Sequence, residues 1–271
     1  DYVKLWGRDL PLRYNLTPRV RAGTNRTDPI TRVDFMGLAD QLGVAPFSSD
    51  VWIIENNASS AYDGLNFQIE KRYADNWSAR VAYTLGYARG NNDGDPNDEV
   101  NVAQVMENRN LDLLWGPSQY DRRHLLTISG QMEIPGTGGV TLSAVARYMT
   151  GTPFTIHDSN FDPDMNGQLV DPLPSGSYSG TGQNAITVDN AGGLRGAYGP
   201  DYFQLDLRIG YRVRGSGEQT VDIFGELFNA TNRVNWVNPS GDRRSGSYLV
   251  TTQLLAGGYP RQFQAGIRYG F

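Results

Sequence analysis

The chain lacks cysteine altogether, so disulfides, thiolate catalysis and cysteine-based zinc clusters are unavailable to it. It also lacks any run of about 18 apolar residues, which excludes a transmembrane helix. Basic residues are outnumbered by acidic ones, 24 to 29, so the net charge is −5 and the pI is about 5.1. Since nucleic acid favours basic surfaces, we expect no nucleic-acid partner.

What the chain has in quantity is glycine, tyrosine and tryptophan, with 32 Gly, 15 Tyr and 5 Trp. This composition fits a sheet protein with many turns and with aromatic residues at membrane interfaces. A β-barrel is compatible with the missing apolar runs, because only alternate residues of a membrane-spanning strand need be apolar.

Apolar and polar residues alternate in seven segments. In the last of them, 262–271, apolar residues occupy every second position and polar residues or glycines fill the rest. Successive side chains of a strand point to opposite faces, so each segment predicts a strand with one apolar and one polar face. The seven predicted strands are 65–73, 77–87, 126–134, 140–148, 203–213, 220–228 and 262–271.

Short and long connections alternate along the chain. The short ones, 74–76, 136–139 and 214–218, are rich in Gly, Asp and Asn and predict hairpin turns. The long ones are polar and run over about 90–119, 157–201 and 230–260. Outer-membrane barrels have short periplasmic turns and long extracellular loops, so the topology predicts an antiparallel transmembrane β-barrel.

A soluble β-sandwich is the alternative fold, because its strands also alternate. Strands of about ten residues and very long loops favour the barrel. Residues 1–58 are less regular: 2–6 predict the stub of an eighth strand, 9–50 a long loop with a short helix at 35–42, and 51–54 an extension of the next strand.

Five phrases of the sequence are similar, in order, to one family. They are ENNASSAYDGL running into IEKRY (55–73), the strand 77–89, GPSQYDRRH (116–124), TGTPFT (150–155) and ELFNATN (226–232). The series resembles the TonB-dependent outer-membrane receptors of the Oar-like type, which often carry a carboxypeptidase-regulatory-like domain at their N-terminus.

The resemblance implies that residues 1–271 are about the last eight strands of a larger barrel, of the plugged 22-strand type. The family's plug domain, TonB-box and earlier strands are absent from this sequence. It also implies transport across the outer membrane of a Gram-negative cell, with the TonB complex as a partner through the missing plug. Eight strands could instead close into a small filled barrel, but the predicted inward Ser, Thr, Gly and Ala are small for that purpose.

Aromatic residues at the turn end predict a membrane girdle that anchors the strands at the depth of the lipid headgroups. The predicted girdle consists of Tyr73, Trp77, Tyr211, Tyr269 and Phe271. By resemblance to the family, Phe271 is also the terminal aromatic that the outer-membrane insertion machinery recognises.

A DPDMNG segment matches the first half of a calcium loop, with alternate oxygen ligands and a glycine at the sixth position. Its predicted ligands are Asp162, Asp164, Asn166 and Asp171, the last replacing a glutamate absent from the twelfth position. An Asx-rich turn without Ca²⁺ is the alternative. We expect no other cofactor.

His124 and His157 are the only histidines. A barrel-borne hydrolase would pair one of them with a serine, whereas His124 at the mouth of a strand also fits a hydrogen-bonded rim residue. We therefore expect no enzyme activity. The leading hypothesis is a TonB-dependent receptor, with a structural or adhesive small barrel and a hydrolase as alternatives. No motif names a substrate.

Overall fold

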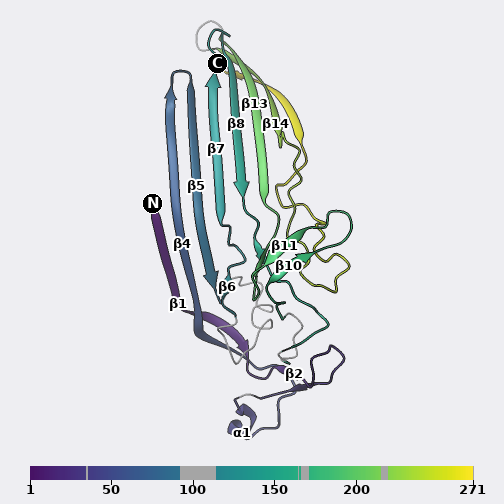
Figure 1. Ribbon diagram of the computed structural model, residues 1–271. Coiled ribbons are helices and arrows are strands. Elements are labelled where there is room, and N and C mark those ends of the chain that lie inside the picture. The colour runs from purple at the N-terminus through teal and green to yellow at the C-terminus, as the bar shows by residue number, and fades with distance from the viewer. Residues whose placement is uncertain (35, 92–113, 164, 166–170, 215–218, 271) are drawn as a thin grey trace.

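The computed structural model describes residues 1–34, 36–91, 114–163, 165, 171–214 and 219–270. Long strands form one antiparallel sheet, and Figure 1 shows it with the hairpin turns uppermost and the loops below. The sheet order is β1 (Tyr2–Asn15), β4 (Trp52–Ala74), β5 (Trp77–Gly90), β7 (His124–Glu133), β8 (Val140–Met149), β13 (Tyr202–Arg214), β14 (Thr220–Phe228) and β15 (Gln262–Gly270). The two-residue strand β6 (Gly116–Pro117) pairs with the loop end of β5.

The predicted all-β antiparallel class is confirmed, and each of the seven predicted strands is present. The expected stub at residues 2–6 is a full strand, β1, which extends to Asn15. Two register shifts between Gly7 and Leu12 carry β1 through a segment that the sequence indicated as loop. The predicted helix is confined to α1 (Leu38–Leu42), between two glycines in left-handed conformation.

One face of the sheet is largely apolar, with Lys4, Asp63 and Lys71 as exceptions, because the register places apolar residues opposite one another. Val81 lies opposite Ile69 and Ile128, Ile128 lies opposite Ala146, and Ala146 lies opposite Leu205. Large apolar side chains on this face are strongly exposed. Among them are Leu65, Phe67, Ile69, Ile128, Leu207, Ile209, Ile223, Phe263 and Ile267, with exposed fractions of 40% to 73%.

The soluble sandwich is therefore the wrong alternative. Its inward faces would bury these side chains, but no second layer of described residues covers them. The buried apolar residues of the described chain lie mainly at the loop end, in two small clusters. Among the described residues, no helix is both long enough and apolar enough to cross a membrane.

The opposite face is polar and is crossed by ion pairs between neighbouring strands. Arg208 Nη1 lies 2.7 Å from Glu226 Oε1, and Arg212 Nε lies 2.6 Å from Asp222 Oδ1. Aromatic rings fill the space above glycines on this face. An added Cβ at Gly266 would lie 2.5 Å from Phe224 Cζ, so only glycine leaves room for that ring.

The loop end carries structure of its own that the sequence did not predict. A four-stranded sheet contains β10 (Gly176–Ser179), β11 (Thr187–Asn190), β12 (Ala197–Tyr198) and β9 (Pro153–Phe154). Strands β2 (Arg19–Arg21) and β3 (Ile30–Arg32) form a hairpin in the first loop. A core of Ile156, Val188, Ala197 and Leu249 joins segments from two loops.

The large sheet is open within the described chain. β1 pairs only with β4, β15 pairs only with β14, and the two lie at opposite sides of the sheet in Figure 1. Tyr2 lies opposite Leu65, so the part of β4 beyond Asn66 is bordered on one side only, by β5.

Candidate functional site: a two-faced wall and its loop assembly

The turn end of the apolar face holds three of the five predicted girdle residues. Trp77 lies opposite Met132, Tyr211 lies between Val140 and Ile223, and Tyr269 lies opposite Val221. Their exposed fractions are 41%, 42% and 56%. The structure thus places these rings together on one surface, and their anchoring role stays a prediction. Phe271 lies outside the described residues.

Tyr73 lies differently from the other predicted girdle residues. The register of β4 against β5 shifts between Lys71 and Ala74, which breaks the alternation just before the turn. The Tyr73 hydroxyl lies 3.4 Å from the Glu133 carboxylate, and its ring lines a hollow on the polar face. The bulge therefore turns Tyr73 away from the surface that Trp77 occupies.

A second set of aromatic residues lies on the apolar face in the loop half of the sheet, and sequence reasoning missed it. Each ring has a polar partner: Tyr2 with Asp63, Trp6 with Lys4, Tyr83 with His124, Tyr87 with Arg123, and Tyr148 with Asp201. Rings that are apolar on one side and polar at the tip suit the boundary between lipid and water. The alternation already predicted the face of Tyr83, Tyr87 and Tyr148, which was the available signal.

The distance between these two aromatic levels is close to the height of the apolar band of an outer-membrane barrel. Phe203, opposite Tyr148, and Tyr211 are eight residue steps apart on β13. At about 3.3 Å per step and a tilt of about 40°, this corresponds to roughly 20 Å along the membrane normal. Outer-membrane barrels carry an apolar band of about 25 Å, so the exposed face has the dimensions of a membrane-spanning surface.

The polar face forms a hollow of about 980 Å³ at the turn end. Its charged lining includes Glu133, Arg208, Arg212 and Asp222, of which the two arginines are already paired. A face of paired charges suits contact with water or with a polar surface rather than with lipid.

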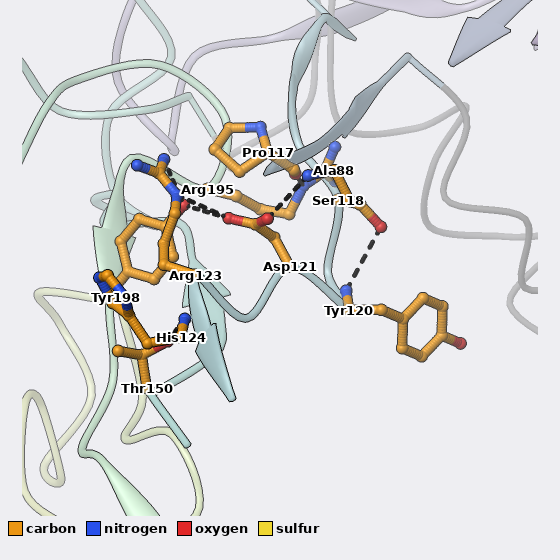
Figure 2. Close-up of polar contacts among 10 residues, drawn as sticks. All are labelled: Ala88, Pro117, Ser118, Tyr120, Asp121, Arg123, His124, Thr150, Arg195 and Tyr198. Atoms are coloured by element: carbon orange, nitrogen blue, oxygen red, sulfur yellow. Dashed lines mark hydrogen bonds and ion pairs between the residues drawn. The ribbon is translucent and has the colours of Figure 1, made fainter. Parts of the chain in front are cut away.

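The GPSQYDRRH segment forms a clamp at the base of the second long loop, centred on the buried carboxylate of Asp121 (Figure 2). Asp121 Oδ1 accepts from the Ala88 amide at 2.8 Å. Asp121 Oδ2 accepts from the Tyr198 hydroxyl at 2.6 Å and from Arg123 Nε at 3.1 Å. Arg123 also donates to the Tyr198 oxygen at 2.8 Å. One carboxylate thus joins β5, the entry to β7 and β12.

Burial, together with the hydrogen bond to Asp121, raises the pKa of Tyr198 to about 12. A free tyrosine has a pKa near 10, so the protonated ring is favoured in the folded state. Its contribution to stability is complete below about pH 10 and is lost as the pH rises through about 12.

We expect Tyr198→Phe to remove one late-titrating phenol and to abolish this alkaline dependence at the loop base. The measurement is the ultraviolet difference titration of the two proteins between pH 9 and 13, roughly the range spanned by both pKa values. Tyr120→Phe is the control, because Tyr120 is 66% exposed. Equal titration curves for the Tyr198→Phe protein and the unchanged protein would contradict the expectation.

Two further ion pairs tie the loops to one another. Arg21 Nε lies 2.8 Å from Asp162 Oδ2, and these side chains are only 3% and 0% exposed. Arg244 Nε lies 2.8 Å from Asp158 Oδ1. The first pair joins the β1–β4 loop to the β8–β13 loop, and the second joins the β8–β13 loop to the β14–β15 loop. The three loops therefore form one interlocked assembly.

The predicted calcium site is only partly described. Asp164 and Asn166 lie outside the described residues, and Asp162 is held by Arg21. The described residues contain no group of three or more His, Asp or Glu side chains placed to hold a metal ion. Calcium binding by this segment stays a prediction.

A cation at Asp162 would have to displace the Arg21 guanidinium. We therefore expect Arg21→Met to strengthen calcium binding, measured as heat on titrating millimolar calcium into the folded protein (an amount suited to extracellular-type sites of about 10⁻⁴–10⁻³ M). The Arg21→Met, Asp162→Asn double variant is the control and should bind less. Absence of heat in the unchanged protein, the single variant and the double variant would show that this segment does not bind calcium.

His124 lies where a rim residue was predicted. Its Nδ1 lies 2.8 Å from the Tyr83 hydroxyl, and the two rings stack with centroids 6.1 Å apart. Its amide donates to Thr150 Oγ1. Within the described chain no serine hydroxyl is among its hydrogen-bond partners, so a serine–histidine pair is not assembled there.

The sheet is antiparallel, with short turns at one end and long loops at the other. One face is polar, and the other is apolar over about the height of a membrane. These are the features of the wall of a transmembrane β-barrel. Comparison with known families matches residues 2–264 to the outer membrane beta barrel domain, and the chain belongs to that family. Its location is the outer membrane, and its apolar face contacts membrane lipid. No curated protein and no solved structure gives a significant match.

Proposed function

We propose that this chain is the C-terminal wall of a TonB-dependent outer-membrane receptor, which moves a substrate across the membrane with energy relayed through a plug domain. The open sheet is the observation that carries the proposal. In the described chain, β1 and β15 each pair on one side only. In lipid, each unsatisfied backbone group costs several kcal/mol, about 2–7 by transfer estimates, so each edge requires a partner strand. In the proposed receptor, other strands of the larger barrel supply both partners.

The sequence segments that resemble TonB-dependent receptors support the same proposal, because residues in two of them make the hydrogen bonds at the bases of the loops. Asp121 and Arg123 of GPSQYDRRH form the clamp described above. Asn229 of ELFNATN is buried, and its side-chain amide donates to the carbonyls of Arg233 and Tyr259, both at 2.9 Å. These residues fix the loops at one end of the polar face. A receptor that admits a ligand from outside requires such an ordered loop end.

A small closed barrel with a structural or adhesive role is the second candidate, favoured by the interlocked loops. In that barrel β1 would pair with β15. The two candidates therefore differ in which strands are neighbours, and this difference can be measured directly.

Cysteine pairs test it, because the chain has no cysteine of its own. Val3 or Leu5 on β1 would be replaced together with Gln264 or Arg268 on β15, and the protein would be oxidised in the outer membrane. A disulfide needs Cα atoms about 4.4–6.8 Å apart. We expect no intramolecular crosslink in any pair, whereas Leu207 and Leu227, opposite one another on β13 and β14, should crosslink as the control.

The TonB part of the proposal needs its own measurement. We expect an epitope tag at Gly182 to recover a polypeptide much heavier than 30.0 kDa, crosslinked to TonB by formaldehyde in energised cells. An intramolecular β1–β15 disulfide in a polypeptide of about that mass would support the small barrel instead. A heavy polypeptide that never crosslinks to TonB would retain the wide barrel and remove TonB coupling.

A further inference from the structure

The apolar face is not smooth, since a groove of about 1000 Å³ crosses it. Three small residues lie in one cross-strand row at its floor: Ala79 opposite Gly130, and Gly130 opposite Ala144. The next row toward the turns holds the large side chains of Trp77, Met132 and Leu142, each opposite the next. On the loop side the lining includes Ile128, Ala146 and Leu205.

The Lys71 side chain lies at the β4 end of the row of small residues. Lys71 on β4 lies opposite Ala79, so it occupies the same cross-strand row, at the turn end of the apolar face. Its ammonium lies 4.0 Å from the centre of the Trp77 ring. Two of its three donors reach the carbonyls of Ala74 at 2.7 Å and of Trp77 at 3.2 Å. The turn therefore holds this charge in place, with Asp75 4.0 Å away and 88% exposed.

We propose that the groove is a binding site for one phospholipid of the leaflet at the turn end, with an acyl chain over Ala79, Gly130 and Ala144 and the phosphate at Lys71. The lining offers an acyl chain an almost wholly apolar surface. The Lys71 ammonium lies beside the groove, over the ring of the lining residue Trp77, and complements a phosphate. Because each row is fixed by strand register, the groove exists before the lipid arrives.

A second copy of the chain fits this groove less well. Two apolar faces in contact would take Lys71, together with its partner Asp75 at 4.0 Å, out of water, and the desolvation cost of an ion pair can exceed the attraction within the pair. A phospholipid supplies the anion and the chain in one molecule. Membership of the outer membrane beta barrel family also implies that this face contacts lipid.

The test uses photoactivatable lipid in vesicles that contain the full chain. The probe is phosphatidylethanolamine with a diazirine in one acyl chain, and the readout is the fraction of label on the β7–β8 peptides after irradiation. Diacylglycerol with the same diazirine chain is the probe without phosphate. Ala144→Leu fills the floor, Lys71→Gln removes the charge, and Ala265→Leu is the matched control on the apolar face outside the groove.

We expect phosphatidylethanolamine to label β7–β8 at least five-fold more than the β4 segment around Phe67, which lies on the same face. Ala144→Leu should abolish this excess, Lys71→Gln should reduce it several-fold, and Ala265→Leu should leave it unchanged. Label spread evenly over the apolar face, an excess that survives Ala144→Leu, or equal labelling by diacylglycerol would each overturn the proposal. A crosslink between two protein copies at Ala144 would overturn it in favour of a dimer contact.

Discussion

Ile128→Arg is expected to destabilise the folded protein in lipid by about 2–4 kcal/mol, the cost of a basic residue on the lipid face near the bilayer midplane. Ile128 lies in the middle of β7, opposite Val81 and Ala146, and is 42% exposed on the apolar face. No carboxylate is opposite it in either neighbouring strand. The measurement is the free energy of unfolding by urea or guanidinium in lipid vesicles.

Ser129→Arg is the matched control, one residue further along the same strand. Ser129 lies on the polar face, opposite Arg80 and Val145, and lines a hollow there. We expect its effect to be within about 1 kcal/mol, since lumen-side substitutions tune selectivity more than stability. Equal destabilisation by both variants would mean that the two faces do not differ in environment.

Asp162→Ala is expected to cost about 3–5 kcal/mol of the local stability of the loop assembly, because it leaves the Arg21 charge buried. Three backbone hydrogen bonds join the same two loops: Arg21 N to Met165 O, Arg26 N to Asn160 O, and Asp162 N to Thr24 O. Hydrogen exchange of these amides measures the effect. Since each 1.4 kcal/mol is tenfold, exchange should be faster by on the order of 100-fold or more.

Two controls separate the buried charge from a general effect of substitution. The double variant Arg21→Met, Asp162→Leu removes both charges and should exchange much more slowly than Asp162→Ala alone. Lys4→Met breaks an ion pair whose side chains are 42% and 43% exposed and should change stability by less than about 1 kcal/mol. If Asp162→Ala and Lys4→Met were alike, the Arg21–Asp162 pair would not hold the loops.

The strands were predictable because each strand needs only local information. The alternation in 203–213 identifies its two faces, and the structure pairs that strand with β8 and β14 on the expected register of apolar with apolar residues. The turn at 74–76 was predictable from Ala-Asp-Asn, since Asp75 and Asn76 adopt positive φ angles of 52° and 68°. The side of each turn follows from the same pattern, but the strand ends do not, since β1 continues to Asn15 and β4 begins at Trp52.

The loop assembly was not predictable, because it depends on contacts between distant segments. Arg21 and Asp162 are 141 residues apart, and nothing near either residue indicates the other. Tyr73 was assigned to the girdle by its position before a turn, and a single register shift moved it to the polar face. The aromatic residues in the loop half, such as Tyr87, became interpretable only once Arg123 was placed beside them.

Cysteine scanning of β13 tests the two-faced wall most directly, since the native chain carries no cysteine. Each position from Phe203 to Val213 would carry a spin label in the outer membrane, and its accessibility to oxygen and to a water-soluble nickel chelate would be measured. We predict that odd positions are accessible to oxygen and even positions to the chelate. Odd positions shielded from both reagents, with even positions in bulk water, would mean that the apolar face lies against protein and that the chain does not span the membrane by this sheet.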